Sequence, residues 1–143
     1  MSMPEAYITH SERETEELAF RLAENGKIRY GDIIALYGEL GAGKTAFARG
    51  LAVYFAPECR VTSPTFALVN QYGNIFHFDM YRINSEDDLL SVGFYDYLGG
   101  PGEKLIIIEW FDKIESFFDE HTVKIDIIKS GGNERRIYAY TRN

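Results

Sequence analysis

The stretch Gly38-Glu39-Leu40-Gly41-Ala42-Gly43-Lys44-Thr45 decides the fold that this sequence predicts. It matches the pattern G-x-x-x-x-G-K-[ST], in which glycines let backbone N–H groups curl around a phosphate without interference from Cβ atoms. The apolar run at 33–37 precedes it and predicts a buried strand. A helix is expected from Gly43-Lys44 to a stop before Pro57. Strand, glycine-rich turn and helix in this order are the context that nucleotide binding requires.

The rest of the chain predicts an α/β fold, with a mixed, mostly parallel sheet flanked by helices and a terminal β-hairpin. Ser11 and Glu14 form a capping-box pattern at the start of the first helix. Gly73-Asn74 joins two β-rich runs and is a hairpin signal. In chain order, the other expected elements are a helix at 11–25, strands at 66–72 and 75–81, a helix at 85–97, a strand at 104–109, a short helix at 112–118 and hairpin strands at 123–128 and 135–141.

Composition sets the class of protein before any motif is considered. The 143 residues carry a net charge of −7 and are 45% hydrophobic, which predicts one globular domain over 1–143. The acidic balance disfavours a broad nucleic-acid surface but allows a small positive site. No apolar run approaches the roughly 20 residues that cross a membrane, and no secretory signal is visible at the N-terminus. Cys59 is the single cysteine, so no intramolecular disulfide can form and a cytoplasmic location is expected.

Two carboxylates are candidates for the chemistry that a bound nucleotide needs. Glu109 follows the apolar run Leu105-Ile106-Ile107-Ile108. Four apolar residues and then an acid are the pattern of the second motif that accompanies a phosphate-binding loop (P-loop) such as residues 38–45. Asp79 lies in a β-rich segment where alternation places it on one face with His77 and Tyr81. A solvated strand residue is the alternative for Asp79. The sequence leaves open which carboxylate binds metal directly, and its three histidines are too scattered to predict a zinc site.

The segment Val61-Thr62-Ser63-Pro64-Thr65-Phe66 has two interpretations. It is either a rigid polar turn before the hairpin or a switch loop that senses a γ-phosphate through its hydroxyls. Trp110, next to Glu109, is either a packing residue or one that positions the acid.

Together these motifs resemble the TsaE (YjeE-type) family. The resemblance rests on four stretches in this order: residues 38–45, Ser63-Pro64-Thr65-Phe66, His77-Phe78-Asp79-Met80-Tyr81-Arg82 and Ile108-Glu109-Trp110. That family comprises small bacterial P-loop ATPases required for making threonylcarbamoyladenosine in tRNAs that read ANN codons, and its members work with the TsaB–TsaD pair. The resemblance implies a P-loop NTPase fold with ATP and Mg²⁺ as cofactors. Because the 38–45 pattern fixes no arginine finger, we expect a slow ATPase whose site a partner completes.

The resemblance also implies roles for individual residues. The catalytic residues would be Glu109, Asp79 and Lys44, and the metal ligands Thr45 and Glu109. The expected nucleotide contacts are Glu39, Leu40, Gly41, Ala42, Gly43, Lys44 and Thr45, with Ser11, Glu12, Thr15, Gly132 and Arg136 near the base. The expected switch residues are Ser63, Thr65, His77, Tyr81, Arg82 and Trp110. Phe111 stands where the family usually has Pro, a departure that concerns the local turn rather than the chemistry of Glu109.

Two other functions stay open at this point. The first is a P-loop small-molecule kinase, although too few residues follow Gly102 to build a separate arginine-bearing lid. The second is a module that holds ATP as a switch without hydrolysing it. The acidic charge predicts that the chain alone does not hold tRNA tightly.

Overall fold

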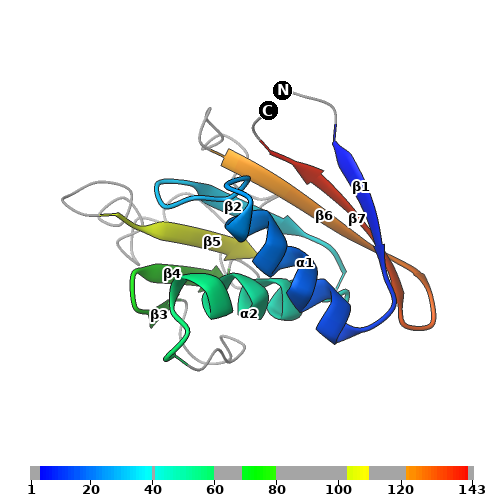
Figure 1. Cartoon of the computed structure of the whole chain (residues 1–143). Coiled ribbons are helices and arrows are strands. Elements are labelled where there is room, and N and C mark those ends of the chain that lie inside the picture. Colours follow the sequence, from blue (N-terminus) through cyan, green and yellow to red (C-terminus); the bar gives the residue numbers. More distant parts are fainter. Residues whose placement is uncertain (1–3, 40, 60–68, 80–102, 110–121, 142–143) are drawn as a thin grey trace, which may run out of the picture.

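The computed structural model describes residues 4–39, 41–59, 69–79, 103–109 and 122–141. In this part of the chain, α1 (Glu12–Glu24) and α2 (Lys44–Phe55) pack on one face of a seven-stranded sheet (Figure 1). The strands are β1 (Glu5–Thr9), β2 (Ile33–Tyr37), β3 (Val69–Tyr72), β4 (Ile75–Asp79), β5 (Leu105–Glu109), β6 (Thr122–Gly131) and β7 (Glu134–Tyr140). Neither described helix is long and apolar enough to cross a membrane.

The strand order is β1-β7-β6-β2-β5-β4-β3. The three central pairings, β6–β2, β2–β5 and β5–β4, are parallel, whereas β1–β7, β7–β6 and β4–β3 are antiparallel. The described sheet is therefore evenly mixed, and the expectation of a mostly parallel sheet is wrong. One antiparallel pairing comes from β1, which the sequence did not predict because this edge strand is mainly exposed and has no clean apolar alternation.

The first helix begins and ends where its signals predict. The Ser11 hydroxyl accepts a hydrogen bond of 3.1 Å from the Glu14 N–H, and Asn25 caps the C-terminus. The Glu14 carboxylate accepts from the His10 N–H at 2.9 Å, one residue before the position that a standard capping box uses. The Ser11 hydroxyl thereby pairs the N–H of Glu14, one of the four N–H groups that a helix start leaves without an intrahelical partner, while the bond to His10 holds the residue before the cap.

The second helix packs its apolar stripe into the core. Phe47 and Leu51 are fully buried among side chains from the helix-facing side of the sheet, including Ile34 and Ile107. Gly50 lies where α1 crosses α2, because a Cβ there would lie 2.1 Å from the Glu16 carbonyl oxygen. Because these side chains pack tightly in the core, the core fixes the position of the start of α2 and of the loop before it.

Both predicted hairpins form in the described residues. Gly73 and Asn74 connect β3 to β4, and β6 and β7 pair with a register shift between Lys129 and Gly131. The strands at 33–37 and 104–109 are also confirmed, as β2 and β5. The expected helices at 85–97 and 112–118 lie outside the described residues, as do 66–68 and 80–81.

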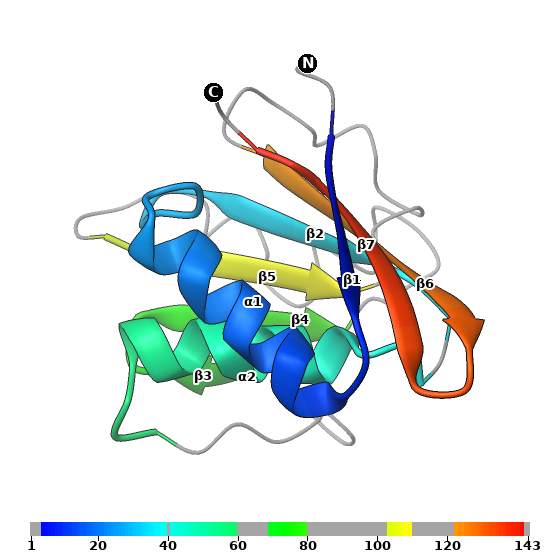
Figure 2. The same ribbon diagram turned by 45° about the vertical axis from the view of Figure 1, so that its right-hand side comes forward.

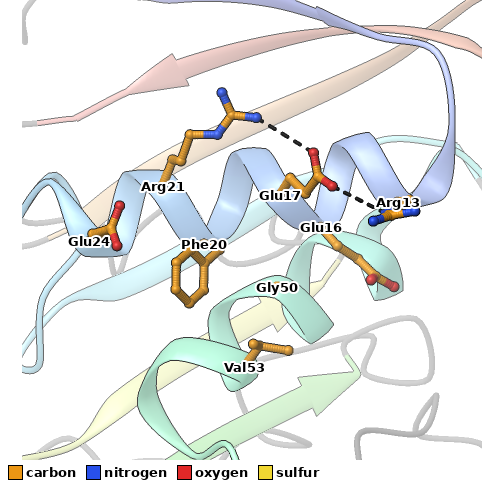
Figure 3. A pocket seen from close by; sticks show the side chains of 8 residues that line it. All are labelled: Arg13, Glu16, Glu17, Phe20, Arg21, Glu24, Gly50 and Val53. Atoms are coloured by element: carbon orange, nitrogen blue, oxygen red, sulfur yellow. Dashed lines mark hydrogen bonds and ion pairs between the residues drawn. The ribbon is translucent and has the colours of Figure 1, made fainter.

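A depression of about 440 Å³ opens on the outer side of α1 and α2 (Figure 3). Arg13, Glu17 and Arg21 form a row of ion pairs along one wall, while Phe20 and Val53 supply apolar surface. None of the described residues of the 38–45 turn, which are 38, 39 and 41–45, lines this depression. The site of interest therefore lies elsewhere, at the N-terminal end of α2.

Candidate nucleotide site

The glycine-rich loop, residues 38–45, leaves the end of β2 and enters α2. Gly41 (φ +79°) and Gly43 (φ +117°) have backbone conformations that favour glycine, and Gly43 caps α2 without a side chain. A Cβ on Gly38 would lie 2.8 Å from the Ile127 carbonyl oxygen, so β6 closes against the loop. The first N–H groups of a helix approached by such a loop are a natural anion site.

Lys44 supplies positive charge to this loop. Its residue is 4% exposed, and its Nζ donates a hydrogen bond of 2.5 Å to the Gly38 carbonyl oxygen. The side chain therefore runs back along the loop instead of extending into solvent. Thr45 is half-buried in the first turn of α2, next to Lys44. These two residues stand where a phosphate and its Mg²⁺ would need a cation and a hydroxyl ligand.

A buried acid lies on the strand beside β2. Glu109, the last residue of β5, is 6% exposed and is the register partner of Leu36 in β2 and of Asp79 in β4. Leu105 and Ile107 belong to the helix-facing core, so alternation places Glu109 on the same face as α2. The backbone of Asp79 is thus next to that of Glu109, while its side chain lies outside the described structure.

Glu109 is hydrogen-bonded to His77, which the sequence predicts only as part of a switch segment. His77 Nε2 and Glu109 Oε2 lie 2.5 Å apart, and the His77 side chain is completely buried. The His77 Nδ1 has no hydrogen-bond partner among the described residues. Because an ionised carboxylate only accepts hydrogen bonds, Nε2 carries the shared proton when Glu109 is charged.

The start of α1 borders the loop through one threonine. Thr15 is buried, its Oγ1 lies 2.8 Å from Thr9 Oγ1, and its methyl group is 3.9 Å from where a Cβ of Gly43 would be. Ser11 serves as the helix cap, and Glu12 lies 3.7 Å from Arg49 in an ion pair. Of these three predicted base contacts, Thr15 is the one that the structure brings against the loop.

The terminal hairpin contacts the loop through Arg135, which is not among the site residues expected from the resemblance. Arg135 Nε donates to the Ala42 carbonyl at 2.9 Å, and its Nη1 donates to the Gly132 carbonyl at 2.8 Å. Arg136, the predicted residue, is exposed and lies between Ile8 and Ile128 in the strand register. Alternation with buried Ile137 and Ala139 was the signal that residue 135 faces the helix side.

The structure leaves several predicted residues without a description. Leu40, Ser63, Thr65, Tyr81, Arg82, Trp110 and Phe111 lie outside the described residues. Glu39 is exposed, and its carbonyl accepts a hydrogen bond of 2.9 Å from the Ala42 N–H within the loop.

Mg²⁺ fits the donors that the described residues offer here. They contain no group of three or more His, Cys, Asp or Glu side chains arranged to hold a metal ion. Mg²⁺ commonly takes one or two protein ligands and completes its shell with phosphate oxygens and water. A loop with a hydroxyl residue at the helix start and an acid at the neighbouring strand end suits that mode.

Fold and site together define the class: a mixed α/β protein in which a glycine-rich G-x-x-x-x-G-K-[ST] loop joins a buried parallel strand to a helix. Comparison with known proteins identifies the family. The family model described as "Threonylcarbamoyl adenosine biosynthesis protein TsaE" matches residues 9–137. The chain belongs to the TsaE family.

Individual relatives agree with this membership. The chain is 36% identical over 131 residues to the tRNA threonylcarbamoyladenosine biosynthesis protein TsaE of Rickettsia conorii, covering 88% of this chain and 72% of that protein. It is 31% identical over 144 residues to the protein of the same name from Aquifex aeolicus, covering 96% and 98%. A crystal structure of YdiB from Bacillus subtilis matches with a TM-score of 0.73 and 26% identity, covering 100% of this chain and 90% of that one.

Proposed function

We propose that this chain is a P-loop NTPase of a single domain, which binds ATP with Mg²⁺ on the glycine-rich loop and hydrolyses it during threonylcarbamoyladenosine modification of ANN-decoding tRNAs. The observation that carries the proposal is the loop itself. Three glycine positions, the buried Lys44 and the start of α2 converge between residues 38 and 45. Family membership supplies the pathway, because the family model and the curated relatives carry that description.

Each residue of the site has a role in this proposal. The N–H groups from Gly41 to Thr45 bind phosphate oxygens, and the Lys44 ammonium leaves the Gly38 carbonyl to reach the β- and γ-phosphates. Bound Mg²⁺ would neutralise charge on the phosphates, held by Thr45 and Glu109 directly or through water. Glu109 orients the attacking water or the metal shell, and His77 keeps its carboxylate in place.

Calorimetry with Mg²⁺ and ATP tests the binding step. Lys44→Ala removes a charge-assisted contact, so affinity should fall at least about tenfold. Lys27→Ala is a matched control, because Lys27 lies away from the loop in an ion pair of 3.2 Å with Glu5. Equal affinity of the wild-type and Lys44→Ala proteins for ATP would refute the proposed site.

The partner belongs to the proposal as well. We infer that the isolated chain is a slow ATPase and that the TsaB–TsaD complex completes its site. A net charge of −7 suits a partner surface with basic residues and argues against tight binding of tRNA by this chain alone. A cytoplasmic location, expected from the single cysteine, is part of the same proposal.

Phosphate release, measured with and without TsaB–TsaD, separates the candidate functions. A large rise in turnover on adding the complex is expected. Full-speed hydrolysis by the chain alone, at the roughly 1–100 s⁻¹ typical of kinases, would contradict the partner model. ATP binding without any phosphate release in either mixture would instead indicate a non-hydrolysing module. A gel shift with submicromolar tRNA affinity at physiological salt would refute the absence of direct tRNA binding.

A further inference from the structure

We propose that Arg135, on the terminal hairpin, is a positioning residue of the phosphate site: it fastens the glycine-rich loop from outside and sets the direction of the Gly43 N–H. This inference rests on the proposed nucleotide site and deepens it. Figure 2 shows the segment between β2 and α2 running beside the β6–β7 hairpin, far from it in sequence. Arg135 bridges a sequence separation of 93 residues to reach the loop.

The arginine is held at both ends of its fork. Its Nε donates to the Ala42 carbonyl at 2.9 Å, and its Nη2 lies at a longer 3.4 Å from the Gly41 carbonyl oxygen. Its Nη1 donates to the carbonyls of Gly132 and Glu134 at 2.8 and 2.9 Å. The guanidinium is therefore fixed to the hairpin turn and uses its remaining donors on the loop. A planar fork with several donors makes this geometry possible, and lysine lacks it.

Planarity of the peptide unit turns this contact into control of an N–H group. The peptide between Ala42 and Gly43 carries the carbonyl that Arg135 binds and the N–H of Gly43. In a trans peptide these two groups point in opposite directions. Arg135, by holding the carbonyl outward, turns the Gly43 N–H away from the hairpin. Gly43 is the N-cap of α2, so this N–H belongs to the helix end that would face an anion.

Arg135 also adds positive charge beside the glycine-rich loop. Lys129, the register partner of Arg135 in β6, has its Nζ 3.5 Å from where a Cβ of Gly41 would be. With Lys44, three cationic side chains lie around the loop of a chain whose net charge is −7. A local excess of positive charge on an acidic protein favours a polyphosphate at this place. Arg135 therefore contributes both direction and charge to the binding of the nucleotide.

Four proteins test the proposal: wild type, Arg135→Gln, Arg135→Lys and the control Arg21→Gln. Arg21 is 65% exposed on α1 and pairs with Glu17 at 3.7 Å. Calorimetry measures the Kd of Mg·ATP, and ¹H–¹⁵N spectra of the nucleotide-free proteins follow the Gly43 amide. We expect Arg135→Gln to raise Kd about tenfold through loss of charge-assisted bonds. We expect Arg135→Lys to restore part of the affinity, because it keeps the charge but not the fork.

The Gly43 amide distinguishes positioning from general support of the fold. Its resonance should shift in Arg135→Gln without nucleotide, while amides in α1 keep their positions. A Kd for Arg135→Gln within twofold of wild type, or an unmoved Gly43 resonance, would overturn the proposal. If Arg135→Gln does not fold, Arg135→Lys provides the same two measurements.

The amide measurement needs no ligand, so it also separates this inference from the proposed function. Wild-type protein that fails to bind Mg·ATP would refute the proposed function, whereas wild-type binding with unchanged Arg135→Gln binding would refute the inference alone.

Discussion

His77 on β4 and Glu109 on β5 share a buried hydrogen bond of 2.5 Å between Nε2 and Oε2. The two strands are parallel neighbours in which His77 is the register partner of Ile107, so Glu109 lies two residues further along its strand. The hydrogen bond therefore links the carboxylate of β5 to the neighbouring strand, at the C-terminal end of the parallel strands, where the glycine-rich loop begins. A proposed catalytic acid with 8% side-chain exposure obtains a fixed direction from this one partner.

A double-mutant cycle measures this relationship. His77→Leu leaves the Glu109 carboxylate buried without its donor, and breaking a buried pair in this way costs about 3–5 kcal/mol of unfolding free energy. In His77→Leu/Glu109→Leu neither partner is left alone, so the loss should be smaller than the sum of the two single losses. Urea unfolding of the four proteins provides the comparison. Additive losses would show that the two side chains do not stabilise each other.

Hydrolysis and binding should respond differently at Glu109. Glu109→Gln keeps the size of the side chain and removes its charge, so ATP should still bind on the loop while turnover collapses. Calorimetry and a single-turnover phosphate assay on the same preparation check the two halves of this expectation. An unchanged single-turnover rate would transfer the role to Asp79, whose backbone is the neighbour of Glu109 in register.

Gly50→Ala should destabilise the protein even though helix propensity alone favours alanine by about 0.5–1 kcal/mol. The new Cβ would lie 2.1 Å from the Glu16 carbonyl oxygen and 2.8 Å from the Ala19 Cβ, so α1 and α2 must separate. Overpacking of this kind costs about 1–3 kcal/mol or more. Thermal unfolding gives the sign directly. Val53→Ala, at a 55% exposed position of the same helix, is the control and should change stability little. A more stable Gly50→Ala protein would contradict the close crossing.

Alkaline pH should weaken the fold through Tyr7. Burial and the hydrogen bond of 2.5 Å to Glu5 raise the pKa of the Tyr7 hydroxyl from 10.0 to about 12. Between these two values the folded chain keeps a proton that the unfolded chain has released, so this contribution to stability is lost as pH rises through that window. Urea unfolding at several alkaline pH values should show a shallower loss for Tyr7→Phe than for wild type. Glu5→Gln should remove only part of the effect, because burial is the larger cause. Identical pH slopes for wild type and Tyr7→Phe would contradict the raised pKa.

Local signals in the sequence were sufficient for the elements that build the loop. The strand at 33–37, the helix start at Lys44 and the cap at Ser11 follow from apolar runs, glycine positions and side-chain caps, all of which act within a few residues. The edge strand β1 was missed because its residues gain their pairing only from β7, at the far end of the chain. The evenly mixed sheet has the same origin, since strand order is set by contacts between distant segments.

The sequence by itself determined which residues are suited to bind a phosphate and a metal ion. They are a glycine-rich loop that ends in Lys44 and Thr45, and the acid Glu109, which follows an apolar run. Only the tertiary structure decided which partners these residues have. In the folded chain His77 is hydrogen-bonded to Glu109, and the arginine that contacts the loop is Arg135 and not Arg136. The physical reason is that a side chain's face on a strand follows from local alternation, whereas its partner depends on strand order and register. Strand order and register are fixed only when the helices bury one face of the assembled sheet.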